Sequence, residues 1–213
     1  MSLNPPYEPG HDACKSHPAE QCLTVALRGR QSLRAYLNRA QVDLSTITAL
    51  DVDGAKTSDL AELARLPALT ALGLWSWYTF EDLRPLAGQS GLSGLTRLIL
   101  YGCTARDLSP LAHLRTLTTL ELCSCFFSDL SPLVGLPALT TLYLGSCNQV
   151  SDLSPLVGLP ALTTLYLDDC SQLHDLAPLA TLPTLTTLHL SGCQRTSDLS
   201  PLAGLTYLTA HVR

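Results

Sequence analysis

Leucines recur along most of the chain with a nearly fixed period, and over short stretches they alternate with polar or small residues. The segment Asp129–Leu144 returns almost letter for letter as Asp152–Leu167. Related copies, at steps of 22–25 residues, begin at Asp59, Asp82, Asp107, Asp175 and Asp198. A period in this range predicts a repeat architecture in which each unit stacks on its neighbours.

An L-x-L pair in each copy predicts a short strand. The pairs are Leu50/Val52, Leu72/Leu74, Leu98/Leu100, Leu120/Leu122, Leu142/Leu144, Leu165/Leu167 and Leu188/Leu190. Because side chains alternate along a strand, each pair points inward and the residue between them points outward. One copy cannot bury its leucines alone. Stacked copies share a core to which each enclosed leucine contributes about 1.5–3 kcal/mol before conformational entropy is counted.

The second half of each copy reads as a short helix or turn on the opposite side. Serine is expected at the helix N-cap and proline at the first helical position in Ser109–Pro110, Ser131–Pro132, Ser154–Pro155 and Ser200–Pro201. Two rows recur whatever their neighbours are, namely the aspartate that starts each copy and the threonines. We interpret both rows as structural, held by local turn hydrogen bonds and β propensity. The threonines are Thr118, Thr140, Thr163 and Thr186.

The L-x-x-L-x-L core at this period resembles a leucine-rich repeat, and its length resembles the bacterial internalin-like and phosphatase-regulator-like subclass. The resemblance covers about residues 44–210. It implies an α/β leucine-rich-repeat solenoid with a parallel concave sheet and short helices or turns on the convex side. Seven to eight repeats are expected in residues 41–213, with the last one incomplete.

The first 40 residues do not match the repeat. The segment Ala19–Ala40 reads as one or two helices with Leu23, Leu27, Leu33 and Leu37 on an apolar side. We therefore interpret residues 1–40 as a leader followed by a helical N-terminal cap. At the other end, His211 is expected where a core leucine belongs, and no polar terminal cap is visible.

Cysteine occupies one equivalent slot in five copies, at Cys103, Cys125, Cys147, Cys170 and Cys193. This recurrence predicts a buried ladder of reduced thiols, whereas Cys123 falls on an outward-facing row. Before the repeats, His11, Cys14, His17 and Cys22 could form a tetrahedral zinc site. Their spacing matches no zinc family, so we favour a partly solvated leader and expect no metal and no other cofactor.

Outward-facing positions of the strands differ from copy to copy, which makes the concave face the candidate binding site. Its central row contains Asp51, Gly73, Ile99, Glu121, Tyr143, Tyr166 and His189. The row two residues further on contains Asp53, Trp75, Tyr101, Cys123, Gly145, Asp168 and Ser191. Large aromatic side chains among acidic ones are typical of binding hot spots. We expect binding by Trp75, Ile99, Tyr101, Glu121, Tyr143, Tyr166, Asp168 and His189.

Charge narrows the class of partner. No lysine or arginine lies between Arg115 and Arg195, so the repeats lack the clustered cations that nucleic acid requires. The apolar residues of the uncharged stretch 130–151 follow the repeat pattern, so we reject a membrane span there. The start shows no secretory signal, and we expect a cytoplasmic location. A partner protein or peptide with a basic or neutral surface fits best.

Two other functions and a second mode of association stay open. Asp168, His189 and Tyr166 could perform acid–base chemistry, although no phosphate loop, nucleophile elbow or HExxH motif occurs, so we expect no enzyme. The chain could instead be the ligand-sensing region of a larger bacterial signalling protein. Two copies could also form a homodimer through the C-terminal edge at Leu208 to Val212.

Overall fold

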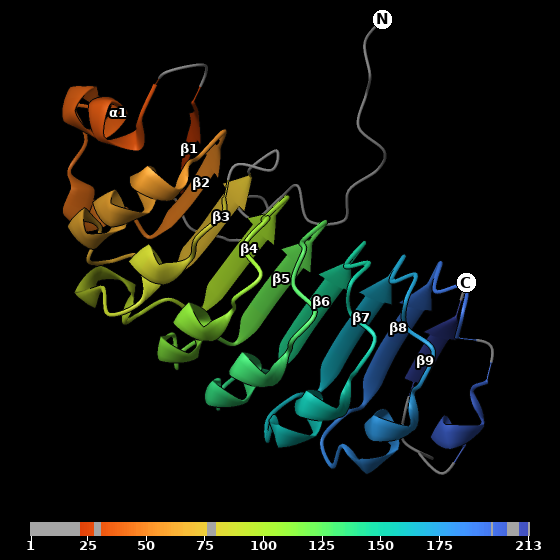
Figure 1. Cartoon of the computed structure of the whole chain (residues 1–213). Helices are drawn as coiled ribbons and strands as arrows, with labels where there is room; N and C mark the ends of the chain where they lie inside the picture. Colours follow the sequence, from red (N-terminus) through yellow and green to blue (C-terminus); the bar gives the residue numbers. More distant parts are fainter. Residues whose placement is uncertain (1–21, 28–30, 76–79, 197, 204–208, 213) are drawn as a thin grey trace, which may run out of the picture.

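The computed structural model describes residues 22–27, 31–75, 80–196, 198–203 and 209–212. It shows one sheet of nine parallel strands that follow one another in chain order, as Figure 1 shows. They are β1 (Cys22–Ala26), β2 (Ala49–Asp53), β3 (Ala71–Trp75), β4 (Arg97–Tyr101), β5 (Thr119–Cys123), β6 (Thr141–Gly145), β7 (Thr164–Asp168), β8 (Thr187–Ser191) and β9 (Thr209–Val212). The predicted solenoid is confirmed, and eight of the described strands, β2–β9, lie after residue 40.

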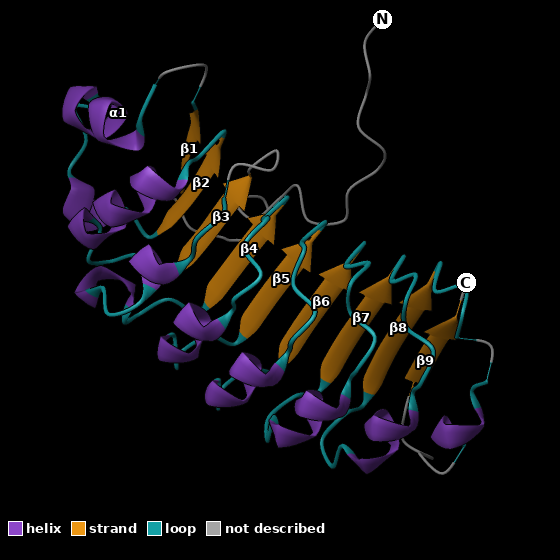
Figure 2. Cartoon of the chain, viewed as in Figure 1, coloured by secondary structure: helices purple, strands orange, loops and turns teal. Residues whose placement is uncertain are grey.

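Short helical turns all lie on one side of this sheet (Figure 2). Nine are 3-10 turns: η1 (Leu44–Thr46), η2 (Thr57–Arg65), η3 (Arg84–Leu86), η4 (Ser90–Leu92), η5 (Ser109–His113), η6 (Ser131–Gly135), η7 (Ser154–Gly158), η8 (Ala177–Thr181) and η9 (Ser200–Leu202). The opposite side of the sheet carries the two rows of outward-facing residues. We call that side the concave face.

The predicted serine N-caps are wrong. In η6, the N-cap is Leu130, which makes no side-chain cap hydrogen bond, and Ser131 and Pro132 are the first two helical residues, each one position later than expected. The repeated aspartate does the work instead, because Asp129 Oδ1 accepts a hydrogen bond of 2.8 Å from the Ser131 backbone N–H. The same contact recurs at Asp82, Asp107, Asp152, Asp175 and Asp198. The structural role assigned to this row is confirmed.

Threonine side chains tie each coil to the one before it. Thr118 Oγ1 donates to the Thr96 carbonyl at 3.1 Å, and Thr140 Oγ1 donates to the Thr118 carbonyl at 3.0 Å. Thr163 and Thr186 continue the series. The threonine row is thus structural, as expected. Inside the coil, the leucines from β2 to β8 and most of those in the turns form a single buried cluster, which begins at Val25 in β1 and ends at Leu202 in η9.

The N-terminal helical prediction is right for one half and wrong for the other. Residues Leu33–Arg39 form the helix α1, with Leu33 and Leu37 buried as expected. Cys22–Ala26, by contrast, is the strand β1, which pairs with β2. Tertiary pairing decided the outcome, because β2 offers an open edge to which this segment adds. The division of the chain at residue 40 stays a prediction, although the sheet begins before it.

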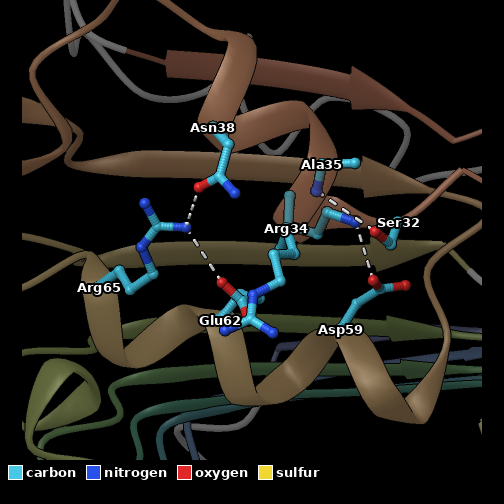
Figure 3. A network of polar contacts seen from close by, with 8 residues as sticks. Ser32, Arg34, Ala35, Asn38, Asp59, Glu62 and Arg65 are labelled. Carbon is cyan, nitrogen blue, oxygen red and sulfur yellow. Dashed lines mark hydrogen bonds and ion pairs between the residues drawn. The ribbon is translucent and has the colours of Figure 1, made fainter.

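Polar contacts fix α1 against η2 (Figure 3). Asp59 is buried, and its Oδ1 accepts from the Leu33 backbone N–H at 2.8 Å while its Oδ2 accepts from the Lys56 backbone N–H. Glu62 lies between two cations, with Arg34 at 3.3 Å and Arg65 at 3.1 Å. The first coil is therefore joined to the second by both a strand and a helix.

At the other end of the sheet, β9 corrects the expectation for His211. The register pairs Ala210 with Leu188 and Val212 with Leu190, so these two residues take the positions of the core leucines. His211 pairs with His189 and belongs to the central row of the concave face. The step from Thr187 to Thr209 is one residue shorter than the step from Thr164 to Thr187, which shifts every position by one. A homodimer through this edge stays a prediction.

Candidate protein-binding face

The alignment of the two concave rows is confirmed by the strand register. Each central-row residue pairs with the next one along the row, as Glu121 does with Tyr143 and Tyr166 with His189. The second row is aligned in the same way, with Trp75 beside Tyr101 and Gly145 beside Asp168. Repeat spacing alone was sufficient to predict which side chains are neighbours across the sheet.

The exposure of the central row was predicted wrongly for five of its members. Asp51, Gly73, Ile99, Glu121 and Tyr143 are buried, with Ile99 only 1% and Tyr143 9% exposed. Strands lie about 4.8 Å apart, so a large side chain in the row is covered by its neighbours on both sides. Tyr166 and His189 stay half-buried, as do Trp75, Tyr101 and Asp168 in the second row. These five are the predicted binding residues that stay accessible, and Asp53, Cys123 and Ser191 of the second row are accessible as well.

Aromatic rings gather in two groups on the concave face. Trp75 and Tyr101, on β3 and β4, have ring centroids 5.7 Å apart with planes tilted by 31°. Tyr143 and Tyr166 have centroids 5.6 Å apart, and Tyr166 stacks on His189 at 4.3 Å with nearly parallel planes. Ring pairs of this kind contribute about 0.5–1.5 kcal/mol beyond their buried area, which makes each group stiff.

Tyr143 lies flat along the sheet because its neighbour has no side chain. A Cβ at Gly145 would stand 2.7 Å from Tyr143 Cε1, so only glycine leaves room for the ring. The phenol then donates a hydrogen bond of 2.8 Å to Asp168 Oδ2 on β7. Burial, followed by the nearby Asp168 carboxylate, raises the pKa of Tyr143. The hydroxyl therefore stays protonated and keeps Asp168 in place. Gly145 is the one signal in the sequence that could have predicted this contact.

A second polar contact crosses the middle of the face. The Arg97 guanidinium on β4 lies 2.6 Å from Glu121 Oε1 on β5, and both side chains are largely covered. Desolvation raises the pKa of Glu121, and the attraction of Arg97 opposes that rise only in part. Glu121 was expected to contact a partner, but its charge is already matched inside the protein. Glu121 therefore stabilises the concave face but contributes little to its accessible surface.

Two of the three residues considered for acid–base chemistry lie together, and the third is engaged with another group. The His189 imidazole is stacked on Tyr166, while Asp168 accepts the Tyr143 hydroxyl. Within the described part of the chain, no group of three or more His, Cys, Asp or Glu side chains could hold a metal ion. The weak zinc candidates His11, Cys14 and His17 lie outside the described residues, and so does the side chain of Cys22.

The cysteine ladder is buried as predicted over most of its length. Cys103, Cys125, Cys147 and Cys170 are 0–3% exposed, and Cys193 is partly exposed. Each thiol donates to a backbone carbonyl of the preceding coil, for example Cys147 to Leu122 at 3.3 Å. None of the six cysteines with described side chains forms a disulfide, and one of them, Cys123, lies on the concave face. No described helix is both long enough and apolar enough to cross a membrane.

Comparison with known proteins agrees with this geometry. The leucine-rich-repeat family model, which comprises two copies, matches residues 115–158 and 160–204. The crystal structure of internalin C2 from Listeria monocytogenes is 34% identical with a TM-score of 0.63. The match covers 79% of this chain and 72% of that one. The chain belongs to the leucine-rich-repeat family. It is internalin-like, because the identity extends over most of both proteins.

Two further solved structures show how far this leucine-rich-repeat fold extends. Internalin F from Listeria monocytogenes is 27% identical with a TM-score of 0.54, over 78% of this chain and 54% of that one. The leucine-rich-repeat domain of the type III effector XopL is 25% identical with a TM-score of 0.71, over 90% and 68%. No curated protein sequence matches the chain significantly. Leucine-rich repeats generally serve as protein–protein interaction modules.

Proposed function

We propose that this leucine-rich-repeat protein is a recognition module that binds a partner protein on its concave face. The observation that carries the proposal is the group of five half-buried residues Trp75, Tyr101, Tyr166, Asp168 and His189, which present stiff aromatic surface beside an acidic group. Aromatic anchors of this kind supply contact area at a low cost in side-chain entropy and dominate many interfaces.

The chemistry of the partner follows from charge. Arg97, the arginine on this face, already pairs with Glu121. The coils from β5 to β8 carry no lysine or arginine, and Asp168 and Asp169 lie at the end of β7. Complementary potentials raise association rates and suppress wrong pairings. We therefore assign a basic or neutral surface to the partner. Asp168, at the end of β7, is the acidic residue that would contact this surface.

A displayed library of random peptides can test this assignment. Peptides selected on the full chain are measured again on Trp75→Ala, Tyr166→Ala and the convex control Val157→Ala. Val157 lies on η7 and is 43% exposed, so its truncation removes apolar surface from the opposite side. We expect the selected peptides to be rich in arginine or lysine. The two aromatic variants should bind these peptides with an affinity that is lower by about tenfold or more, because each such anchor contributes at least about 1.4 kcal/mol.

Salt and charge variants separate the acidic contact from the aromatic ones. Asp168→Asn should lower the association rate at low salt and lose its effect as ionic strength rises. Tyr166→Ala should instead raise the dissociation rate at any salt concentration. Peptides whose affinity falls with Val157→Ala, and survives both aromatic substitutions, would place the binding site on the convex side and reject the proposal.

A further inference from the structure

The five thiols of the cysteine ladder occupy the same slot but differ in their access to solvent. All of them point into the coil and donate to a carbonyl of the preceding coil, Cys170 to Leu144 at 3.5 Å and Cys193 to Leu167 at 3.4 Å. Cys103, Cys125, Cys147 and Cys170 are buried, whereas Cys193 is only partly buried. Solvent therefore reaches the ladder at its C-terminal end.

Cys193 also lies beside a second thiol. Cys170 and Cys193 hold the same slot in adjacent coils, each two residues beyond the paired residues Asp168 and Ser191. The neighbouring Cys170 thiol lowers the pKa of Cys193, whereas the Cys193 thiol, with burial, raises the pKa of Cys170. Thiolates rather than thiols react with electrophiles, so the pair combines an accessible thiol of lowered pKa with a buried second thiol.

We propose that Cys170 and Cys193 form a peroxide-reactive dithiol site that closes to a disulfide. The Cys193 thiolate attacks one oxygen of hydrogen peroxide, an S–O bond forms, the O–O bond breaks, and the departing hydroxide takes up a proton to become water. The Cys170 sulfur then attacks the Cys193 sulfenic acid. An S–S bond forms, the S–O bond breaks, and the Cys170 proton leaves with the hydroxide as a second water. Two thiols are oxidised and one peroxide is reduced.

The backbone permits this bond. Equivalent residues of adjacent coils lie about 4.8 Å apart, within the separation of about 4.4–6.8 Å between Cα atoms that a disulfide spans. Cys170 and Cys193 lie two residues after β7 and β8, whose last residues Asp168 and Ser191 are paired in the concave face. The disulfide would thus fasten two coils beside the proposed binding surface.

The other end of the ladder provides an internal comparison. Cys103 and Cys125 are neighbours in the ladder in the same way, and the neighbouring Cys125 thiol lowers the pKa of Cys103. Cys103, however, is 1% exposed, so peroxide cannot reach its sulfur. Burial raises the pKa of Cys147 to about 12, which removes its thiolate as well. Contact between thiols and access to solvent coincide at Cys193.

The test exposes the full native chain to hydrogen peroxide and follows each cysteine by alkylation and mass spectrometry. Cleavage before aspartate separates the two thiols, because Asp175 lies between Cys170 and Cys193. We expect a disulfide-linked pair of peptides that contain these two cysteines, restored to free thiols by dithiothreitol. Cys193 should react at least about tenfold faster than Cys147, since the reactivity of a thiol follows its thiolate character and its access to solvent.

Variants distinguish a reacting pair from a single exposed thiol. Cys193→Ser should abolish the linked peptides, and Cys147→Ser, a matched change in the buried ladder, should leave them unchanged. Cys170→Ser should leave Cys193 as a sulfenic acid that dimedone traps. The wild-type kinetics alone can overturn the proposal, whatever the variants do to folding. It is wrong if Cys193 reacts no faster than Cys147, or if Cys193 is oxidised to the sulfinic acid while Cys170 stays a free thiol.

Discussion

The first coils, through β4, and the regular coils, from β5 to β8, share one core but are built differently. Each regular coil turns through a five-residue 3-10 segment with an exposed aspartate at its start, as in η6 and η7. The first coils contain the helix α1, the nine-residue η2 and the additional turn η4. The aspartate of η2, Asp59, is buried and bonded to another coil.

This difference shows where the stacking of repeats needs extra support. A regular coil has a neighbour on both sides and depends on leucine burial and threonine hydrogen bonds. The first coil has its helix joined to the second by Asp59 and Glu62 (Figure 3), so buried polar contacts supply part of what a second neighbour supplies elsewhere. Stability in a solenoid is approximately a sum over coils and their interfaces, so the two regions can be tested separately.

The largest effect is expected in the leucine core, which the two regions share. Leu165→Ala in the regular coils and Leu50→Ala in the first coils should each lower the free energy of unfolding by about 2–5 kcal/mol, because burial is lost and a cavity remains. Both leucines are almost completely buried. Thr141→Ala, at a half-buried position, should have little effect. Urea denaturation midpoints measure all three, and equal losses at Thr141 and Leu165 would show that the faces are reversed.

Removal of the repeated aspartate should destabilise the first coils, where it is buried, more than the regular coils, where it is exposed. Asp59→Ala leaves the backbone N–H groups of Leu33 and Lys56 without their acceptor and should cost about 1–3 kcal/mol. Asp129→Ala at the exposed equivalent position should cost clearly less, because water replaces the carboxylate. Hydrogen exchange should also show that, in Asp59→Ala, the backbone amides of α1 lose protection before those of the sheet do. An equal loss for both variants would remove the distinction between the regions.

Backbone strain after the strands offers a third comparison. Gly54 has a φ of +75°, and a Cβ there would overlap the Leu27 carbonyl oxygen. Gly54→Ala should therefore cost about 1–2 kcal/mol or more. Ser146 holds the same position in a regular coil with a φ of +51°, so its Cβ is already accommodated. Ser146→Ala should be nearly neutral in thermal melting, and a large loss there would contradict the equivalence of the two turns.

The smallest effects concern the pH dependence of the free energy of unfolding. Asp129 and Glu121 contribute to this dependence with opposite signs. Hydrogen bonds from the Ser131 side chain and backbone lower the pKa of Asp129 below 3.8, so its contribution is present above that pH and is lost as the pH falls. Burial raises the pKa of Glu121 above 4.5, so its contribution is present below that pH and is lost as the pH rises through the raised pKa.

Urea midpoints measured against pH can check both signs. Asp129→Asn should flatten the acid side of the profile, and Glu121→Gln should flatten the decline above pH 4.5. Asp152→Asn is a matched control for Asp129, because Ser154 lowers its pKa in the same way. If Glu121→Gln steepens that decline, the Arg97 ion pair outweighs the desolvation of Glu121.

Much of this protein follows from its sequence alone. The period fixed the strand register from β2 to β8, so Leu142 pairs with Leu165 and Tyr166 with His189 as predicted. Burial of the leucines and of most ladder cysteines followed from alternation. These features depend on contacts between identical positions of adjacent coils. Any sequence that repeats determines such contacts, because each copy offers its neighbour the same surface.

Only the tertiary structure decided the contacts between residues that differ from one copy to the next. The pairing of Tyr143 with Asp168, and of Arg97 with Glu121, depends on how side chains lean across the sheet, which no period specifies. The β1 segment became a strand because the open edge of β2 accepted it, against a helical pattern in its leucines. The contact between Cys170 and Cys193 is specified by the repeat, but the access of solvent to Cys193 depends on how completely the neighbouring coil covers it.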